Sequence, residues 1–298
     1  MKTSISILAA GALLLSTQAG AQTASQAPRP SAPGASATAG SPDPLAPRPI
    51  DAVDTVFMEE MTWMEIRDAI KAGKDTVIVA SGGLEQNGPY LVTAKHNIAL
   101  RAVTDRLARK LGNALVSSII QFVPEGSIDP PTGHMKYPGT ISLTAATFEA
   151  LLTDVASSLK TNGFRSIVFI GDSGGNQAGM KKVAEALSAK WTSEGHQARV
   201  YFIPEYYRYP ELHEWIRTEM GITQVDEGLH DDYAISAMMA LVDPLSLRLP
   251  QRVVKGRDTI NAVKLSPLSK TQEDGRRIVE RRVDETIAAL KKAMAAAK

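Results

Sequence analysis

The residues best suited to chemistry lie in the glycine-rich stretch 80–91, ASGGLEQNGPYL, and just after it. The run 76–80 before it is apolar and predicts a buried strand, and the glycines let the backbone turn sharply where that strand ends. Glu85 lies in this turn, and His96 follows it. Open α/β sheets hold their ligands outside the carboxyl ends of the strands. We therefore expect Glu85 and His96 to belong to a functional site.

Three further segments bring carboxylates, imidazoles and hydroxyls to comparable places. They are the turn 171–176 after a predicted strand, the helix start 230–232, and the loop 124–140, whose length is typical of functional loops. Their candidate side chains are Asp172, Ser173 and Asn176, then His230 and Asp232, and in the loop His134 and Tyr137, both expected to face the site. Such a cluster either holds a divalent metal that activates water or performs acid–base catalysis without metal.

The first 50 residues precede the fold. Residues 1–21 have a charged start, an apolar run and a small-residue cleavage pattern, which predict a secretory signal peptide and a periplasmic or secreted protein. Residues 22–50 are rich in Ala, Pro and Ser and predict a disordered linker. The remaining residues, 51–298, suit one domain.

Composition limits the partners and the chemistry. The chain has 33 basic and 32 acidic residues without blocks of one sign, so nucleic acid is not expected as a partner, nor is a membrane after signal cleavage. Cysteine is absent, which excludes disulfides, thiolate metal sites and cysteine nucleophiles. A small-molecule substrate remains the expected partner.

Strands that alternate with helices predict an α/β fold, a three-layer α/β/α sandwich with a mostly parallel central sheet. A capping box at Thr62 and Glu65 begins the first helix. The expected strands are 76–80, 114–123, 166–170 and 198–203, and the expected helices are 63–70, 98–111, 144–162, 180–191, 234–241 and 270 to the end. The last helix is expected to cover the sheet. Tyr207, with neighbouring aromatic residues, is a candidate pocket wall, and His196 and His213 are expected on the surface.

Three motifs in residues 62–242 resemble those of the creatininase (creatinine amidohydrolase) family. Glu85-Gln-Asn-Gly-Pro stands against Glu-Gln-His-Gly-Pro, and His134-x-x-Tyr-Pro-Gly-Thr-Ile-Ser against His-x-x-Phe-Pro-Gly-Thr-Ile-Ser. The third, Gly171-Asp-Ser-Gly-Gly-Asn, stands against Asn-Gly-His-Gly-Gly-Asn. The resemblance implies a commonly hexameric α/β sandwich with two zinc or manganese ions that direct water onto the C–N bond of an amide.

The ligand positions that the resemblance implies are largely altered. Glu85 is retained, but Asn87 replaces a histidine and His96 an aspartate. Ser173 replaces the second histidine, and Ala234 stands where a glutamate is expected. The usual two-metal site cannot be intact. Either neighbouring acidic and imidazole groups rebuild one metal site, or the site works without metal.

The hypothesis that follows is an exported, homo-oligomeric hydrolase. It is expected to use a metal ion to cleave a C–N bond of a small cyclic or linear amide. The alternative is a metal-free binding protein or acid–base lyase or isomerase. The expected ligands of Zn, Mn or Fe are Glu85, His96, Asp172, His230 and Asp232; the expected catalytic residues are His134, His96 and Asp172; and the expected substrate-binding residues are Asn87, Tyr137, Ser173, Asn176 and Tyr207.

Overall fold

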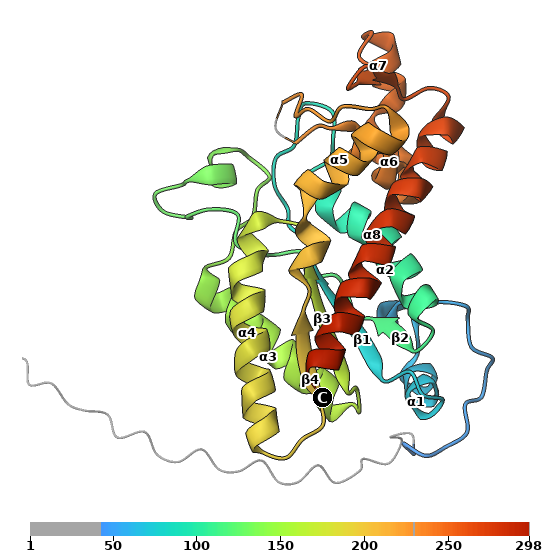
Figure 1. The fold of residues 1–298 in the computed structure, drawn as a ribbon, viewed down its shortest axis with the longest axis vertical. Coiled ribbons are helices and arrows are strands. Elements are labelled where there is room, and N and C mark those ends of the chain that lie inside the picture. Colours follow the sequence, from blue (N-terminus) through green and yellow to red (C-terminus); the bar gives the residue numbers. More distant parts are fainter. Residues whose placement is uncertain (1–42, 229, 298) are drawn as a thin grey trace, which may run out of the picture. The chain divides into compact units, whose positions relative to one another are not determined.

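The structure, a computed structural model, describes residues 43–228 and 230–297 (Figure 1). The chain divides into two units, Met1–Ala46 and Pro47–Lys298. In the first unit only residues 43–46 are described; they form a turn closed by a hydrogen bond from the Ala46 N–H to the Asp43 carbonyl. The expected signal peptide and most of the expected linker lie outside the described residues. The fold and the site belong to the second unit.

The centre of the second unit is a parallel four-stranded sheet in the order β2-β1-β3-β4 (Figure 1). Strand β1 (Thr76–Ser81) pairs with β2 (Ala114–Val116) and with β3 (Ser166–Gly171), and β3 pairs with β4 (Arg199–Phe202). Every residue of β1 and β3 is buried. Continuous apolar runs of this kind are typical of parallel strands covered on both faces.

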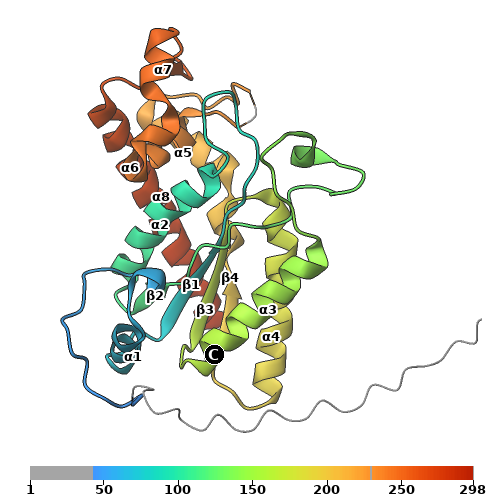
Figure 2. The ribbon, with the colours of Figure 1, turned by 180° about the vertical axis from the view of Figure 1, so that it is seen from behind.

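Helices cover both faces of the sheet, as Figures 1 and 2 show. Side chains alternate between the faces: Ile78 and Ile170 pack with the core formed by α2 (Lys95–Leu111), α6 (Tyr233–Val242) and α8 (Leu268–Ala296). Val77 and Phe169 pack on the opposite side with α1 (Trp63–Lys71), α3 (Ala145–Thr161) and α4 (Gln177–Ser193). The expected three-layer α/β/α sandwich is therefore confirmed.

The remaining elements complete the second unit. The capping box at Thr62 and Glu65 is confirmed at the start of α1. Among the described residues, no helix is both long enough and apolar enough to cross a membrane. The bounds of the other elements are α5 (Tyr209–Met220), α7 (Leu249–Val254), β5 (Thr259–Ile260) and β6 (Val263–Lys264).

Two expectations about the elements were wrong. The strand expected over 114–123 ends at Val116, and beyond it Ile120 and Val123 form only isolated bridges. The segment after β4, for which no helix was expected, contains α5, in which Pro210 lies in the first turn. A proline is compatible with this position because the first N–H groups of a helix have no intrahelical acceptor.

Candidate functional site

The candidate site lies where β1 and β3 end. The paired strands end together, with Ser81 opposite Gly171, so the turn that carries Glu85 lies beside the turn that carries Asp172. The Asp172 N–H donates to the Ser81 carbonyl at 3.0 Å. The loop with His134 and the segment before α6 close a cavity of about 790 Å³ over these turns. This is the edge at which open α/β sheets hold ligands.

The Glu85 carboxylate is the centre of the site and is almost fully buried. Its Oε1 lies 2.9 Å from His96 Nε2, 3.1 Å from the Lys95 ammonium and 3.1 Å from His230 Nδ1. Its Oε2 lies 3.1 Å from His134 Nε2. Burial alone would raise the pKa of Glu85, but hydrogen bonds from His230 and His96 and the charges of His96 and Lys95 hold it well below its usual value. Glu85 is therefore ionised.

His96 is held between two carboxylates. Its Nδ1 lies 2.9 Å from Asp172 Oδ2, and its Nε2 lies 2.9 Å from Glu85 Oε1. Burial and the charge of Lys95 act to lower the pKa of His96, but the hydrogen bonds to Asp172 and Glu85 outweigh them and raise it. A neutral ring would turn one nitrogen lone pair toward a carboxylate oxygen. His96 is therefore an imidazolium that links the two acids.

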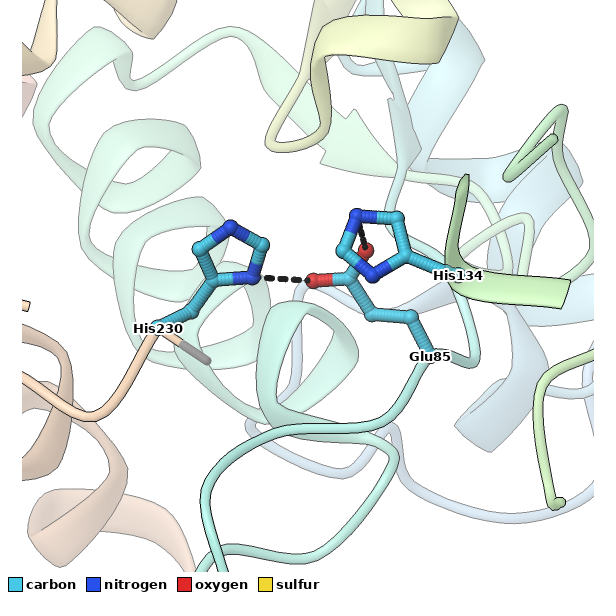
Figure 3. A group of neighbouring side chains, drawn as sticks. All are labelled: Glu85, His134 and His230. Carbon is cyan, nitrogen blue, oxygen red and sulfur yellow. Dashed lines mark hydrogen bonds and ion pairs between the residues drawn. The ribbon is translucent and has the colours of Figure 1, made fainter. Parts of the chain in front are cut away.

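Glu85, His134 and His230 form a group with the composition of a metal site (Figure 3). One ligand atom from each lies within 4.8 Å of the others. His134 and His230 are partly exposed toward the cavity, with 26% and 44% of their side chains accessible. Burial lowers the pKa of His134, which keeps its ring neutral, the form that binds metal. Two imidazoles and one carboxylate suit Zn, and also Fe with open positions.

Glu125 is a second buried carboxyl on the cavity wall. It fits there because Gly83 has no side chain: a Cβ on Gly83 would lie 2.1 Å from Glu125 Oε1. Ser173 donates its hydroxyl hydrogen to Glu125 Oε2 at 3.2 Å. Two causes raise the pKa of Glu125 to about 8: the larger is burial, and the second is the negative charge of Glu85. Two neighbouring carboxyls are thus held in different protonation states at neutral pH, as in many acid–base sites.

The turn that presents His230 is strained and anchored. His230 has a φ of 65°, in the left-handed region that non-glycine residues seldom adopt. Its N–H donates to Asp226 Oδ1 at 2.7 Å. The next residue, Asp231, accepts two hydrogen bonds from the buried guanidinium of Arg252, which also lies over the Tyr90 ring. These contacts hold the imidazole of His230 toward Glu85.

Most of the side chains predicted for the site line one cavity. They are Glu85, His96, His134, Asp172, Ser173, Tyr207, His230 and Asp232. His96 and Asp172 lie outside the group formed by Glu85, His134 and His230. His96 contacts Glu85 and Asp172 through its two ring nitrogens, and Asp172 accepts from Tyr209 and Arg282 through Oδ1. Asp232 caps α6 by accepting from the Ile235 N–H. His134, expected as a catalytic group, also belongs to the group that it forms with Glu85 and His230.

Four expectations differ from the observed positions. Tyr137 is 44% exposed and does not line the cavity. Asn87 donates its amide hydrogens to the carbonyls of Glu85 and Val92, and Asn176 donates to two carbonyls at the end of β1, so both amides support the backbone instead of facing the cavity. His213, expected on the surface, lines the cavity.

Sequence reasoning missed Lys95, Glu125 and Arg282. Arg282 carried a detectable signal, because it follows Ile278 by one helical turn and so falls on the apolar face of the last helix. Lys95 directly precedes the candidate His96, so its position in the sequence could also have indicated a place near the site. No signal in the sequence identified Glu125, whose burial depends on how the loop crosses Gly83.

A sheet with a carboxylate and imidazole cavity at the carboxyl ends of its strands is an architecture that enzymes use. The family model for creatininase, creatinine amidohydrolase, matches residues 59–290. Because this match covers most of the chain, the chain belongs to the creatininase family. The creatinine amidohydrolase of Pseudomonas putida is 31% identical over 116 residues, which are 39% of this chain and 44% of that protein. The alignment thus spans less than half of that relative.

Solved structures of creatininases share the fold. A tryptophan-to-alanine mutant has a TM-score of 0.60 and 22% identity, covering 80% of this chain and 98% of that one. A glutamate-to-glutamine mutant of the Zn-Zn type has a TM-score of 0.58 and 21% identity, covering 81% and 99%. A structure described as creatininase Mn has a TM-score of 0.58 and 20% identity, covering 80% and 99%. At these identities, the likeness establishes the fold.

Proposed function

We propose that this protein is a hydrolase that cleaves the C–N bond of a small cyclic or linear amide with the help of one divalent ion. The observation that carries the proposal is the group formed by Glu85, His134 and His230 at the cavity wall. Membership of the creatininase family supports the reaction class. We also propose export to the periplasm or beyond, and a homo-oligomeric state, on the grounds given by the sequence.

The residues present fit one ion but not two. His230 Nδ1 lies 3.1 Å from Glu85 Oε1, His134 Nε2 lies 3.1 Å from Glu85 Oε2, and one ligand atom from each of the three residues lies within 4.8 Å of the others, which is close enough to share one ion. Among the described residues, two positions at which the resemblance implies donors for a second ion offer none in that role, because Ser173 is hydrogen-bonded to Glu125 and Ala234 is a buried helix residue. We propose Glu85, His134 and His230 as the ligands of Zn, Mn or Fe.

A bound ion would polarise the amide carbonyl and lower the pKa of water. The chain itself contributes fixed charge and a proton source. Lys95 and the His96 imidazolium hold one oxygen of Glu85, so the orientation of this carboxylate is fixed before substrate arrives. Glu125 is protonated at neutral pH beside the ionised Glu85. In the proposed reaction, water adds to the carbonyl carbon and gives up a proton, and the C–N bond breaks. The leaving nitrogen takes a proton from Glu125, and the proton given up by water restores the Glu125 carboxyl, leaving a free acid and an amine.

One observation favours a second candidate, acid–base chemistry without metal. The Lys95 ammonium lies 3.1 Å from Glu85 Oε1 and opposes the approach of a dication to that oxygen. With the His96 imidazolium, it already supplies positive charge where a metal would. A metal-free lyase, isomerase or binding protein would keep these contacts and need no ion.

Metal analysis and hydrolysis assays on the same samples separate the two candidates. The protein is purified without a histidine tag, stripped with a chelator, and incubated with Zn, Mn or Fe(II) before plasma mass spectrometry. Release of amine is then measured from a panel of cyclic and linear amides. We expect about one ion per chain and metal-dependent release, both lost in His134→Ala and His230→Ala.

The matched control is His196→Ala, an exposed histidine outside the site, which should keep both metal and activity. Folded wild-type protein that binds none of the three ions would overturn the metal proposal. Turnover of an amide by such metal-free protein would establish the second candidate.

A further inference from the structure

Arg282 is a fully charged side chain inside the protein, on the face of α8 that packs against the sheet. Only 3% of its side chain is accessible. Its guanidinium lies 4.0 Å from the centre of the Tyr206 ring and 4.7 Å from that of Tyr209. It donates hydrogen bonds to the Tyr206 carbonyl at 2.7 Å, the Tyr209 hydroxyl at 3.1 Å and Asp172 Oδ1 at 3.1 Å. Its environment thus fixes both its position and its orientation.

Asp172 uses its two oxygens differently. Oδ1 accepts from the Tyr209 hydroxyl at 2.9 Å and from Arg282. Oδ2 lies 2.9 Å from His96 Nδ1, and the other ring nitrogen of His96 lies 2.9 Å from Glu85 Oε1. A continuous series of hydrogen bonds therefore runs from α8 to the carboxylate at the centre of the site.

We propose that Arg282 is a positioning residue that holds Asp172, and through it His96 and Glu85, in the orientation that the metal group requires. The part of this inference that concerns the ion rests on the proposed function. Residues that hydrogen-bond to the ligands of a metal fix the orientation of those ligands. The loss of such a residue typically weakens metal binding 10- to 100-fold. A planar guanidinium that stacks on aromatic rings while it donates to several acceptors is specific to arginine, so lysine would replace Arg282 only in part.

The competing explanation is that Arg282 forms a core ion pair that only anchors α8. Both explanations allow Arg282→Met to destabilise the protein, because it leaves the buried Asp172 with one fewer cation. They differ in their effect on the site. Only a positioning role changes the His96–Asp172 hydrogen bond and the affinity of Glu85 for metal in molecules that are still folded.

The test compares Arg282→Met and Arg282→Lys with Arg281→Met. Arg281 is the matched control, because it is the neighbouring arginine on α8 but is more exposed, pairing with Glu285 and lying over the Trp215 ring. Zinc affinity is measured by competition with a chromogenic chelator. We expect a 10- to 100-fold weaker affinity in Arg282→Met, an intermediate loss in Arg282→Lys and no change in Arg281→Met.

A second readout needs no metal. In the metal-free protein, the proton between His96 Nδ1 and Asp172 should give a downfield NMR signal that is absent in His96→Gln. We expect this signal to be lost or shifted in Arg282→Met and kept in Arg281→Met. If wild-type protein binds no zinc, the metal proposal fails, and this signal alone decides the role of Arg282.

Circular dichroism and thermal unfolding identify the folded variants to be compared. If Arg282→Met does not fold, Arg282→Lys and Tyr209→Phe take its place, since Tyr209→Phe removes one donor to Asp172 without changing charge. We expect the same changes, smaller in size. A folded variant with wild-type zinc affinity and an unchanged downfield signal would refute the positioning role.

Discussion

Replacing Glu125 with glutamine should make the stability of the protein less dependent on pH. Burial and the charge of Glu85 raise the pKa of Glu125 from its usual 4.5 to about 8. Between these two values, the folded state holds a proton that the unfolded state has lost. Stability falls with pH wherever the folded state binds more protons. The contribution of Glu125 is therefore fully present below about pH 4.5 and is lost as the pH rises through about 8.

The size of the effect follows from the same two pKa values. The difference between about 8 and 4.5 corresponds to about 5 kcal/mol, at about 1.4 kcal/mol per pH unit. Water entering the cavity and relaxation of the loop reduce this figure, so we expect a change of about 2–3 kcal/mol. Glutamine has nearly the same shape and no proton to lose. Relative to wild type, Glu125→Gln should thus become more stable by about that amount between pH 5 and pH 8.

Urea unfolding of chelator-treated protein at pH 5, 6, 7 and 8 measures this difference. Glu211→Gln, which removes an exposed carboxyl on α5, is the control and should follow wild type. A constant difference between Glu125→Gln and wild type across the four pH values would refute the account of Glu125 as a protonated carboxyl.

Three further predictions concern the groups around the site. Lys95→Met should tighten zinc binding about 10-fold, because it removes an ammonium 3.1 Å from Glu85 Oε1 while His96 still holds that oxygen in place; weaker binding in a calorimetric titration would contradict this. The raised pKa of His96 means that its stabilisation is present below about pH 6.5 and lost as the pH rises through the folded pKa. His96→Gln should therefore flatten the alkaline fall of the urea midpoint, and an unchanged slope would argue against an imidazolium. Arg252→Met should destabilise the fold by about 3–5 kcal/mol, because it leaves the buried Asp231 unpaired. An unfolding free energy within about 1 kcal/mol of wild type would show that the pair does not anchor the turn.

The layers of the fold followed from the sequence because its apolar pattern is strong. The continuous apolar runs of β1 and β3 indicated parallel strands buried on both faces, and both are observed. The helix α5 was missed because its aromatic residues were considered only as a possible pocket wall and no helix was predicted for them. Strand β2 is short because the chain beyond Val116 leaves the sheet, which depends on packing more than on residue type.

Part of the site could be predicted because adjacent parallel strands end at one edge of the sheet. That rule brought Glu85 and Asp172 together, with His96 between them. The same rule could not separate ligands from supporting residues, since His96 has the chemistry of a ligand but lies between the carboxylates of Glu85 and Asp172. Lys95 and Glu125 were missed because their roles depend on burial against Glu85, which sequence spacing does not encode.

The most direct test of the central claim is anomalous diffraction at the zinc edge from crystals of the zinc-loaded protein. We predict one peak per chain, about 2.0–2.2 Å from Glu85, His134 and His230. Two peaks in the cavity would contradict the single-ion site. The absence of a peak there in crystals grown with saturating zinc would contradict the metal-assisted mechanism and leave acid–base chemistry by the same side chains.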